Sequence, residues 1–326
     1  MSGVQASSSG AGRLVTIGIS TFNRVDSTFP EALRSALAQD YPHLEIVVCD
    51  NASADGTEAF MATQADERLR YHRHSHNVGA NGNFNACLEQ ARGEYFLLLH
   101  DDDVLAPGFV RRAMAELGDG EAGVLLGGVR RIDAEGRVTG EVPAPPAGLT
   151  TAELFMSWFD RRISFYFCST LFHTARLRSD GGFATPEDLF QDVVAIARLA
   201  SRSGYAAVPG VGGHFRKHDA NRGAASAALR WARDGKFLLE VLCRELPADC
   251  DRLRAAGEIY LANKTYRAVA AVPSRSERRE LYAEADRLFG GALPPWRFKL
   301  RRHRRLLGRS LGRWVRRASI AAKRRG

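Results

Sequence analysis

Short apolar runs alternate with amphipathic segments through the first hundred residues, and this alternation limits the folds that the chain can adopt. The run Leu14–Ile19 is followed by a segment with apolar residues at helical spacing, and a second run, Leu44–Val48, comes next. A third run lies near 69–72, and the continuous apolar run Tyr95–Leu99 is typical of a strand buried on both faces. Strands that alternate with helices predict an α/β fold with a mostly parallel sheet and helices on both faces.

Polar clusters follow three of these predicted strands directly. They are Ser20–Arg24, Asp50–Thr57 and His100–Asp103. In open sheets of this kind, ligands bind beyond the carboxyl ends of the strands. We therefore expect the three clusters to line one crevice.

The 326 residues are enough for one large domain or two modest ones, and the composition is that of a folded protein, with 45% hydrophobic and 25% charged residues. Disorder, a collagen helix and a disulfide scaffold are excluded on that basis. We divide the chain into a flexible leader (1–12), an α/β domain (13–220), a helical extension (221–295) and a basic amphipathic tail (296–326). Within these parts, we expect a helix over about 186–203, two or three helices over 221–289, and Asn81 or Asn83 as the cap of a helix that reaches Ala91.

The three adjacent carboxylates Asp101, Asp102 and Asp103 indicate a cation site. Like charges at a strand end raise one another's pKa and cost energy unless a cation neutralises them. Mg²⁺ and Mn²⁺ take oxygen ligands from one or two carboxylates together with substrate phosphates. The alternative is that Asp103 caps a helix and the other two are solvated loop charges.

Four ordered segments resemble the family 2 glycosyltransferases, whose nucleotide-binding half has the GT-A fold. They are Ile19–Arg24, Ile46–Thr57, Asn77–Tyr95 and Leu97–Asp103, the last followed by Pro107, and together they cover about a third of the chain. The resemblance implies that the donor is a nucleoside diphosphate sugar. Asp50 would hold the base and Asp101 the ribose. The full set implied to bind the nucleotide is Ser20, Thr21, Phe22, Asn23, Arg24, Asp50, Asn51, Ser53, Asn77, Gly79, Asn81, Asn85 and Asp101.

The resemblance also implies a metal and a diphosphate site. Asp102, Asp103 and His218 would hold Mg²⁺ or Mn²⁺, and Arg216 would neutralise the diphosphate. The sequence departs from the family pattern at His100, where many members have an aspartate. Which of the three aspartates ligates the metal therefore stays open.

Glycosyl transfer needs a base that removes the proton of the acceptor hydroxyl. The segments Gly181–Phe183 and Phe190–Val193 resemble a later part of the family, where an acidic pair precedes a helix. Gln191 replaces the usual glutamate, which leaves Asp192 as the predicted general base of an inverting reaction. As an alternative, Asp192 merely stabilises the amino end of a helix.

Two rival functions remain open from the sequence. A sugar nucleotidyltransferase would need a glycine-rich phosphate loop near the amino end, and Ser20–Arg24 lacks the glycines. A non-catalytic binding or scaffold protein would keep the fold without the chemistry, and Gln191 in place of the expected acid keeps that option open.

The tail and the cysteines bear on location and partners. Residues 296–326 hold thirteen Lys and Arg and no acid, which exceeds the net charge of +9 of the whole chain. Such a basic amphipathic segment suits an anionic membrane surface, whereas nucleic acid is a weaker candidate because the body has no nucleic-acid-binding motif. A third option is that the tail packs on the enzyme. We find no signal peptide and no apolar run of spanning length, and the five cysteines have an odd count without C-x-x-C spacing. We therefore expect bystander thiols and a cytoplasmic protein, with peripheral binding at the inner face of the membrane as an option.

Overall fold

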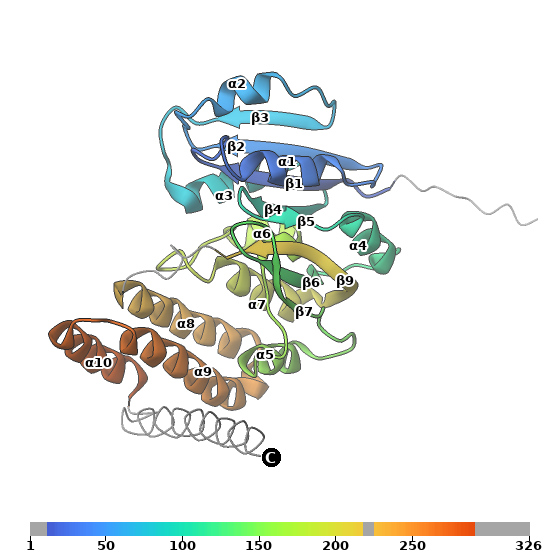
Figure 1. Ribbon diagram of the computed structural model, residues 1–326. Coiled ribbons are helices and arrows are strands. Elements are labelled where there is room, and N and C mark those ends of the chain that lie inside the picture. The colour runs from blue at the N-terminus through green and yellow to red at the C-terminus, as the bar shows by residue number, and fades with distance from the viewer. Residues whose placement is uncertain (1–11, 218–224, 291–326) are drawn as a thin grey trace, which may run out of the picture.

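The computed structural model describes residues 12–217 and 225–290, and in this part of the chain the strands form one nine-stranded sheet (Figure 1). Its order is β3-β2-β1-β4-β8-β6-β9-β5, with β7 paired to β6. The strands are β1 Val15–Thr21, β2 Leu44–Asp50, β3 Leu69–Arg73, β4 Tyr95–His100, β5 Val104–Leu105, β6 Val124–Ile132, β7 Val138–Val142, β8 Thr170–His173 and β9 Tyr205–Arg216.

The first half of the sheet is parallel and the second half is mixed. Strands β3, β2, β1 and β4 pair in parallel, as the alternating sequence pattern predicts. Strand β8 then runs antiparallel between β4 and β6, whereas β6 and β9 are parallel. In the parallel half, Thr21 pairs with Asp50 and Ser20 pairs with His100. The three predicted polar clusters therefore meet at one edge.

Helices cover both faces of the sheet, which confirms the predicted α/β architecture. Helices α1 (Phe29–Leu37) and α4 (Phe109–Leu117) pack on one face against a core that includes Ile17 and Leu97. The remaining helices before the extension are α2 (Thr57–Ala62), α3 (Gly79–Gln90), α5 (Thr151–Phe159), α6 (Thr174–Ser179) and α7 (Gln191–Ser203). Helices α3, α5, α6 and α7 contribute to a second core, on the opposite face of the sheet. This core includes Val47 and Phe96. The alternation of buried side chains along each strand separates the two cores.

Helix α3 begins earlier, and helix α7 begins later, than the sequence pattern predicts. Helix α3 begins at Gly79, so Asn83 lies inside it. The side-chain amide of Asn83 points inward, and its Nδ2 donates to the carbonyl of Cys49 at 2.9 Å. Neither Asn81 nor Asn83 is therefore the cap. Helix α7 begins at Gln191 and not near Pro186, because the preceding backbone amides donate to a carboxylate of the extension.

The described part of the extension has three α-helices, within the predicted two or three: α8 (Ala225–Glu245), α9 (Cys250–Ala270) and α10 (Arg275–Phe289). Figure 1 shows them at the end of the molecule opposite to β3. Within the described residues, no helix combines the length and apolar composition needed to cross a bilayer.

A buried aspartate joins the extension to the α/β domain. Asp234 of α8 is fully buried, and its carboxylate accepts hydrogen bonds from Thr185 Oγ1 at 2.7 Å and from the amides of Glu187 and Leu189 at 2.8 Å. The amide of Phe190 adds a fourth hydrogen bond at 3.2 Å. The segment before α7 is thus shaped by a side chain that lies more than forty residues later in the sequence.

The cysteines are not all bystanders. Cys243 and Cys250 form a disulfide between the end of α8 and the start of α9, which corrects the expectation of thiols only. The sequence pattern missed this pair because two cysteines seven residues apart have no diagnostic spacing. Cys49, Cys87 and Cys168 are free and buried, as expected of bystander thiols.

Candidate functional site

A polar cleft of about 460 Å³ lies at the carboxyl ends of β1 and β4, beside the amino end of α3. Eight of the thirteen residues predicted to bind a nucleotide line it: Ser20, Thr21, Phe22, Arg24, Asn51, Asn77, Gly79 and Asp101. Phe22 is 41% exposed, which is unusual for a phenylalanine and leaves its ring available to a ligand at the cleft. We call this the donor cleft.

The other five predicted residues are not among those that line the donor cleft. They are Asn23, Asp50, Ser53, Asn81 and Asn85. Asp50 is fully buried, and its carboxylate accepts from the Ser53 amide at 2.9 Å and from the Tyr71 hydroxyl at 2.6 Å. Both of its oxygens thus accept hydrogen bonds within the protein, and its contact with the base stays a prediction.

Asparagine side chains fix the two loops that form the donor cleft. The Asn23 carbonyl oxygen accepts from the amide of Ala54 at 2.8 Å, and the Asn51 carbonyl oxygen accepts from the amide of Val78 at the same distance. Asn77 Oδ1 in turn accepts from Asn51 Nδ2 at 2.9 Å and from the Gly79 amide at 2.8 Å. Gly79 has a φ of +79°, a backbone conformation that favours glycine at the start of α3. The loops are therefore held in shape without a ligand.

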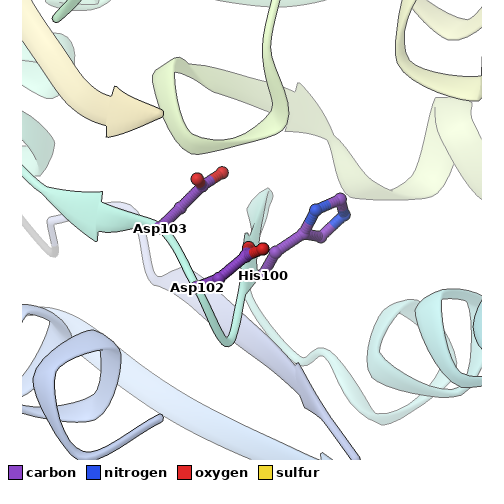
Figure 2. A group of neighbouring side chains, drawn as sticks. All are labelled: His100, Asp102 and Asp103. Carbon is purple, nitrogen blue, oxygen red and sulfur yellow. The ribbon is translucent and has the colours of Figure 1, made fainter. Parts of the chain in front are cut away.

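The turn after β4, Asp101–Asp103, forms the floor of the donor cleft, and we call it the acidic turn. One nitrogen of His100 and one carboxylate oxygen each of Asp102 and Asp103 lie within 4.8 Å of one another, and Figure 2 shows the three side chains extending to the same side of the turn. His100 was not predicted as a ligand and replaces an acid of the family pattern. Because its ring also stacks on Phe84, with centroids 4.8 Å apart, its orientation is fixed.

The electrostatics of the acidic turn favour a bound cation. Burial, opposed in part by hydrogen bonding to the Phe22 amide, raises the pKa of Asp101 to about 6. Burial and repulsion by Asp102 raise the pKa of Asp103 well above its usual value. Burial lowers the pKa of His100, and a neutral imidazole is the form that binds metals. The two carboxylates suit a divalent ion such as Mg²⁺ or Mn²⁺, whereas an imidazole ligand is more typical of transition metals, so the set fits Mn²⁺ better than Mg²⁺.

Arg216 supports the acidic turn and does not line the donor cleft. Only 2% of it is exposed; its Nε donates to the Asp102 carbonyl at 2.9 Å, and Nη2 donates to Glu31 Oε2 at 2.6 Å. Its backbone amide donates to Asp103 Oδ1 at 2.9 Å, and Nη1 donates to the carbonyls of Asp133 and Ala134. All three guanidinium nitrogens of Arg216 thus donate within the protein, and its action on the diphosphate stays a prediction. The predicted metal ligand His218 lies outside the described residues, as does the tail from Trp296.

A second pocket, of about 310 Å³, adjoins the acidic turn and shares His100 with the donor cleft. Aromatic side chains dominate its wall. They are Trp158, Phe165, Tyr166, Phe167, Phe190, Phe215, Trp231 and Tyr260. We call it the aromatic pocket. Asp192 and Lys264 add opposite charges to this wall.

Asp192 has the surroundings expected of a base. Burial raises its pKa to about 7, although the amide of Val193 donates to its Oδ1 at 2.8 Å and Lys264 opposes the shift. The neighbouring Gln191, which replaces the expected acid, donates from Nε2 to Asn81 Oδ1 at 2.8 Å. Gln191 therefore links α7 to α3 instead of adding a second carboxylate to the pocket.

Sequence reasoning missed several residues of both pockets. Ala80, Asn83 and Phe84 line the donor cleft because they occupy the first turns of α3, whose start was misplaced. Trp231, Tyr260 and Lys264 reach the aromatic pocket from α8 and α9. No local signal marks these three, because only the packing of the extension brings them to the site.

Comparison with known proteins identifies relatives of this chain. The family model described as Glycosyl transferase family 2 matches residues 16–179, half of the chain. The chain is 33% identical over 123 residues to the succinoglycan biosynthesis protein ExoO of Rhizobium meliloti, covering 38% of this chain and 35% of that protein. It is 34% identical over 130 residues to a GalNAc(5)-diNAcBac-PP-undecaprenol beta-1,3-glucosyltransferase of Campylobacter jejuni, covering 39% and 41%. The chain thus spans less than half the length of these two relatives.

Solved structures resemble the fold over most of the chain. S. aureus TarS 1-349, solved in complex with UDP-GlcNAc, has a TM-score of 0.55 at 17% identity, covering 88% of this chain and 92% of that one. The mannosyltransferase PcManGT of Pyrobaculum calidifontis, solved with GDP-Man and Mn²⁺, has a TM-score of 0.54 at 21% identity, covering 88% and 82%. At these identities the likeness supports the fold.

Proposed function

Because the chain belongs to glycosyl transferase family 2, we propose that it transfers a sugar from a nucleoside diphosphate sugar to a hydroxyl group of an acceptor. The observation that supports this most directly is the junction at His100, where a cleft rimmed by carboxylates meets an aromatic pocket that contains Asp192. Two substrates that react with each other need adjoining sites, and holding them side by side supplies much of the rate enhancement.

The donor cleft binds the nucleoside diphosphate part of the donor. Arg24 and the exposed ring of Phe22 offer a cation and an aromatic face, and Asn51 and Asn77 hold the loops around them. His100, Asp102 and Asp103 would hold a divalent ion at the diphosphate. When bound, such an ion stabilises the negative charge on the departing diphosphate.

The aromatic pocket binds the acceptor, and Asp192 is the general base of a single inverting displacement. Asp192 takes the proton of the acceptor hydroxyl while that oxygen attacks the anomeric carbon. The bond from the anomeric carbon to the diphosphate oxygen breaks, and its electron pair leaves with the diphosphate. A carboxylate whose pKa is about 7 suits this work near neutral pH.

The relatives indicate the kind of product. Those named above bear names of polysaccharide and lipid-linked glycan synthesis, which favours a saccharide acceptor in glycan or glycoconjugate biosynthesis. The basic tail, 296–326, would bring the protein to the anionic surface where such acceptors are found. That part of the proposal rests on sequence only.

A binding experiment tests the donor half of the proposal. Calorimetric titration of UDP, dTDP, GDP and CDP, each with and without Mn²⁺, should give metal-dependent binding of one nucleotide. Asp102→Asn should weaken that binding about tenfold or more, because a hard cation loses a carboxylate ligand. Asp160→Asn, which alters an exposed acid paired only with Arg162, is the control and should leave binding unchanged.

Other outcomes would favour the rival functions. Binding of none of the four nucleotides would refute the transferase proposal and favour a scaffold. Release of pyrophosphate from a nucleoside triphosphate and a sugar phosphate would instead identify a nucleotidyltransferase.

A further inference from the structure

Lys264 of the helical extension projects into the aromatic pocket. Its Nζ lies 4.2 Å from the centroid of the Trp231 ring and 4.7 Å from that of Phe190. Both rings attract the positive charge through their π faces and hold the side chain in place. The ammonium thus lines the same pocket wall as Asp192, which comes from α7.

The charge of Lys264 is not compensated by a direct partner. Among the described residues, no carboxylate lies within 4.0 Å of its Nζ and no acceptor within 3.5 Å. Burial therefore lowers its pKa to about 8, which the charge of Asp192 only partly opposes. The ring faces stabilise the charge, but they offer no lone pair that could accept a hydrogen bond from any of the three N–H donors. Lys264 is half-buried and lines the pocket, so a ligand there can supply oxygen atoms to its N–H donors.

Lys236 provides an internal comparison within the same extension. Its Nζ also lies near an aromatic ring, 6.0 Å from the centroid of Phe289, but it forms an ion pair with Glu258 at 2.7 Å. A lysine that only joins the helices of this extension therefore has a carboxylate partner. Lys264 has none among the described residues, and it faces a pocket.

The shape and chemistry of the wall match a sugar ring. Trp231 and Phe190 meet edge to face with centroids 4.7 Å apart, and Trp158 and Tyr260 lie 4.9 Å apart on the same wall. Aromatic faces suit the C–H face of a pyranose. Lys264 can donate to one hydroxyl oxygen of the ring, and Asp192 can accept from the neighbouring hydroxyl.

We propose that Lys264 is an acceptor-binding residue and that the acceptor is a pyranoside, bound through two adjacent hydroxyls that reach Lys264 and Asp192. This inference rests on the proposed function, because it takes the aromatic pocket as the acceptor side of the site. It deepens that function by naming a residue of the extension that selects the acceptor. The extension is then part of the active site.

The test measures binding of methyl pyranosides to the full chain in the presence of UDP and Mn²⁺, by saturation-transfer NMR. The probes are the methyl glycosides of glucose, galactose, mannose and N-acetylglucosamine, which have no aromatic aglycone of their own. At least one should bind, and Lys264→Met should weaken it about tenfold or more. Lys264→Arg should retain part of the binding, and the control Lys236→Met should leave it unchanged.

Two results would overturn the inference. One is that the wild-type protein binds none of the pyranosides; the other is that Lys264→Met binds them as well as the wild type. Thermal melting identifies a variant that fails to fold. If Lys264→Met does so, a folded Lys264→Gln decides: pyranoside binding and transfer at the wild-type level in that variant would contradict the role. The same measurement is repeated without UDP and Mn²⁺. A failure of the nucleotide titrations then refutes the proposed function separately from this result.

Discussion

The donor cleft and the aromatic pocket are built in opposite ways, although they share His100. The donor cleft comes from consecutive loops of one parallel sheet, and its shape depends on side chains that bond to nearby backbone, such as Asn51 to Val78. The aromatic pocket gathers rings from α5, α8 and α9, which are far apart in sequence. The first region depends on local structure and the second on tertiary packing. Changes in one should therefore leave the other largely intact.

The largest separation of the two regions should come from Asp192→Asn. An amide cannot accept the acceptor proton, so the rate of transfer should fall about 10²- to 10⁴-fold. Metal-dependent nucleotide binding should stay within a factor of two, since Asp192 does not line the donor cleft. Single-turnover kinetics and calorimetry measure the two quantities. Asp188→Asn, an exposed site four residues earlier, is the control, and strong turnover by Asp192→Asn would refute its role as base.

A second test alters the support of the aromatic pocket from the side of the extension. Asp234→Asn keeps the shape of the side chain but presents an NH₂ group to amides that already donate. The loss of accepted hydrogen bonds should lower the free energy of unfolding by about 2–4 kcal/mol, because buried donors lose their partner. Transfer should fall about ten- to hundredfold as the segment before Asp192 shifts.

The readouts for Asp234→Asn are denaturant unfolding, the transfer rate and the affinity for the nucleotide. Nucleotide affinity should change less than threefold, since the hydrogen bonds that the Asp234 carboxylate accepts within the described residues come from the segment before α7. The exposed acid Asp251 gives the control Asp251→Asn. A parallel loss of nucleotide binding and transfer would show instead that the whole fold depends on this aspartate.

The same contrast explains what could be predicted from the sequence. The parallel strands and the meeting of the three polar clusters follow from local patterns, because a polar cluster after an apolar strand has to lie at the sheet edge. The eight residues that line the donor cleft, and Asp192, were assigned from the resemblance to the family. Asp50 and Arg216 were assigned to ligands, yet both are buried and bonded to the protein. A sequence indicates which polar residues gather at an edge, but not which of them face the ligand.

The residues that were missed have a different cause. Trp231, Tyr260 and Lys264 lie on helices whose pattern indicates packing only, and their pocket exists because α8 and α9 dock on α7 and α5. The disulfide between Cys243 and Cys250 likewise depends on how α8 turns into α9. Such long-range pairings have no local signal.

The smallest expected effect is a difference in pH dependence between the two regions. Asp192 acts as a base only when ionised, and with a pKa of about 7 about a tenth of it is ionised at pH 6. Transfer at saturating donor should therefore fall about tenfold from its plateau to pH 6, with half the plateau near pH 7. The other titratable groups on the same pocket wall are Lys264, His100 and Asp103, and the lysine ammonium favours the ionised form of Asp192.

Nucleotide binding with Mn²⁺ should change little between pH 6.5 and 7.5. Asp101 has a pKa of about 6, and a cation bound next to it lowers that value further, so it stays ionised between pH 6.5 and 7.5. Rate profiles and calorimetry at several pH values separate the two regions, and the residual rate of Asp192→Asn should lack the step near pH 7. If the step persisted in that variant, the titrating group would belong to the acidic turn, and the division between a donor cleft and an aromatic pocket with its own base would fail.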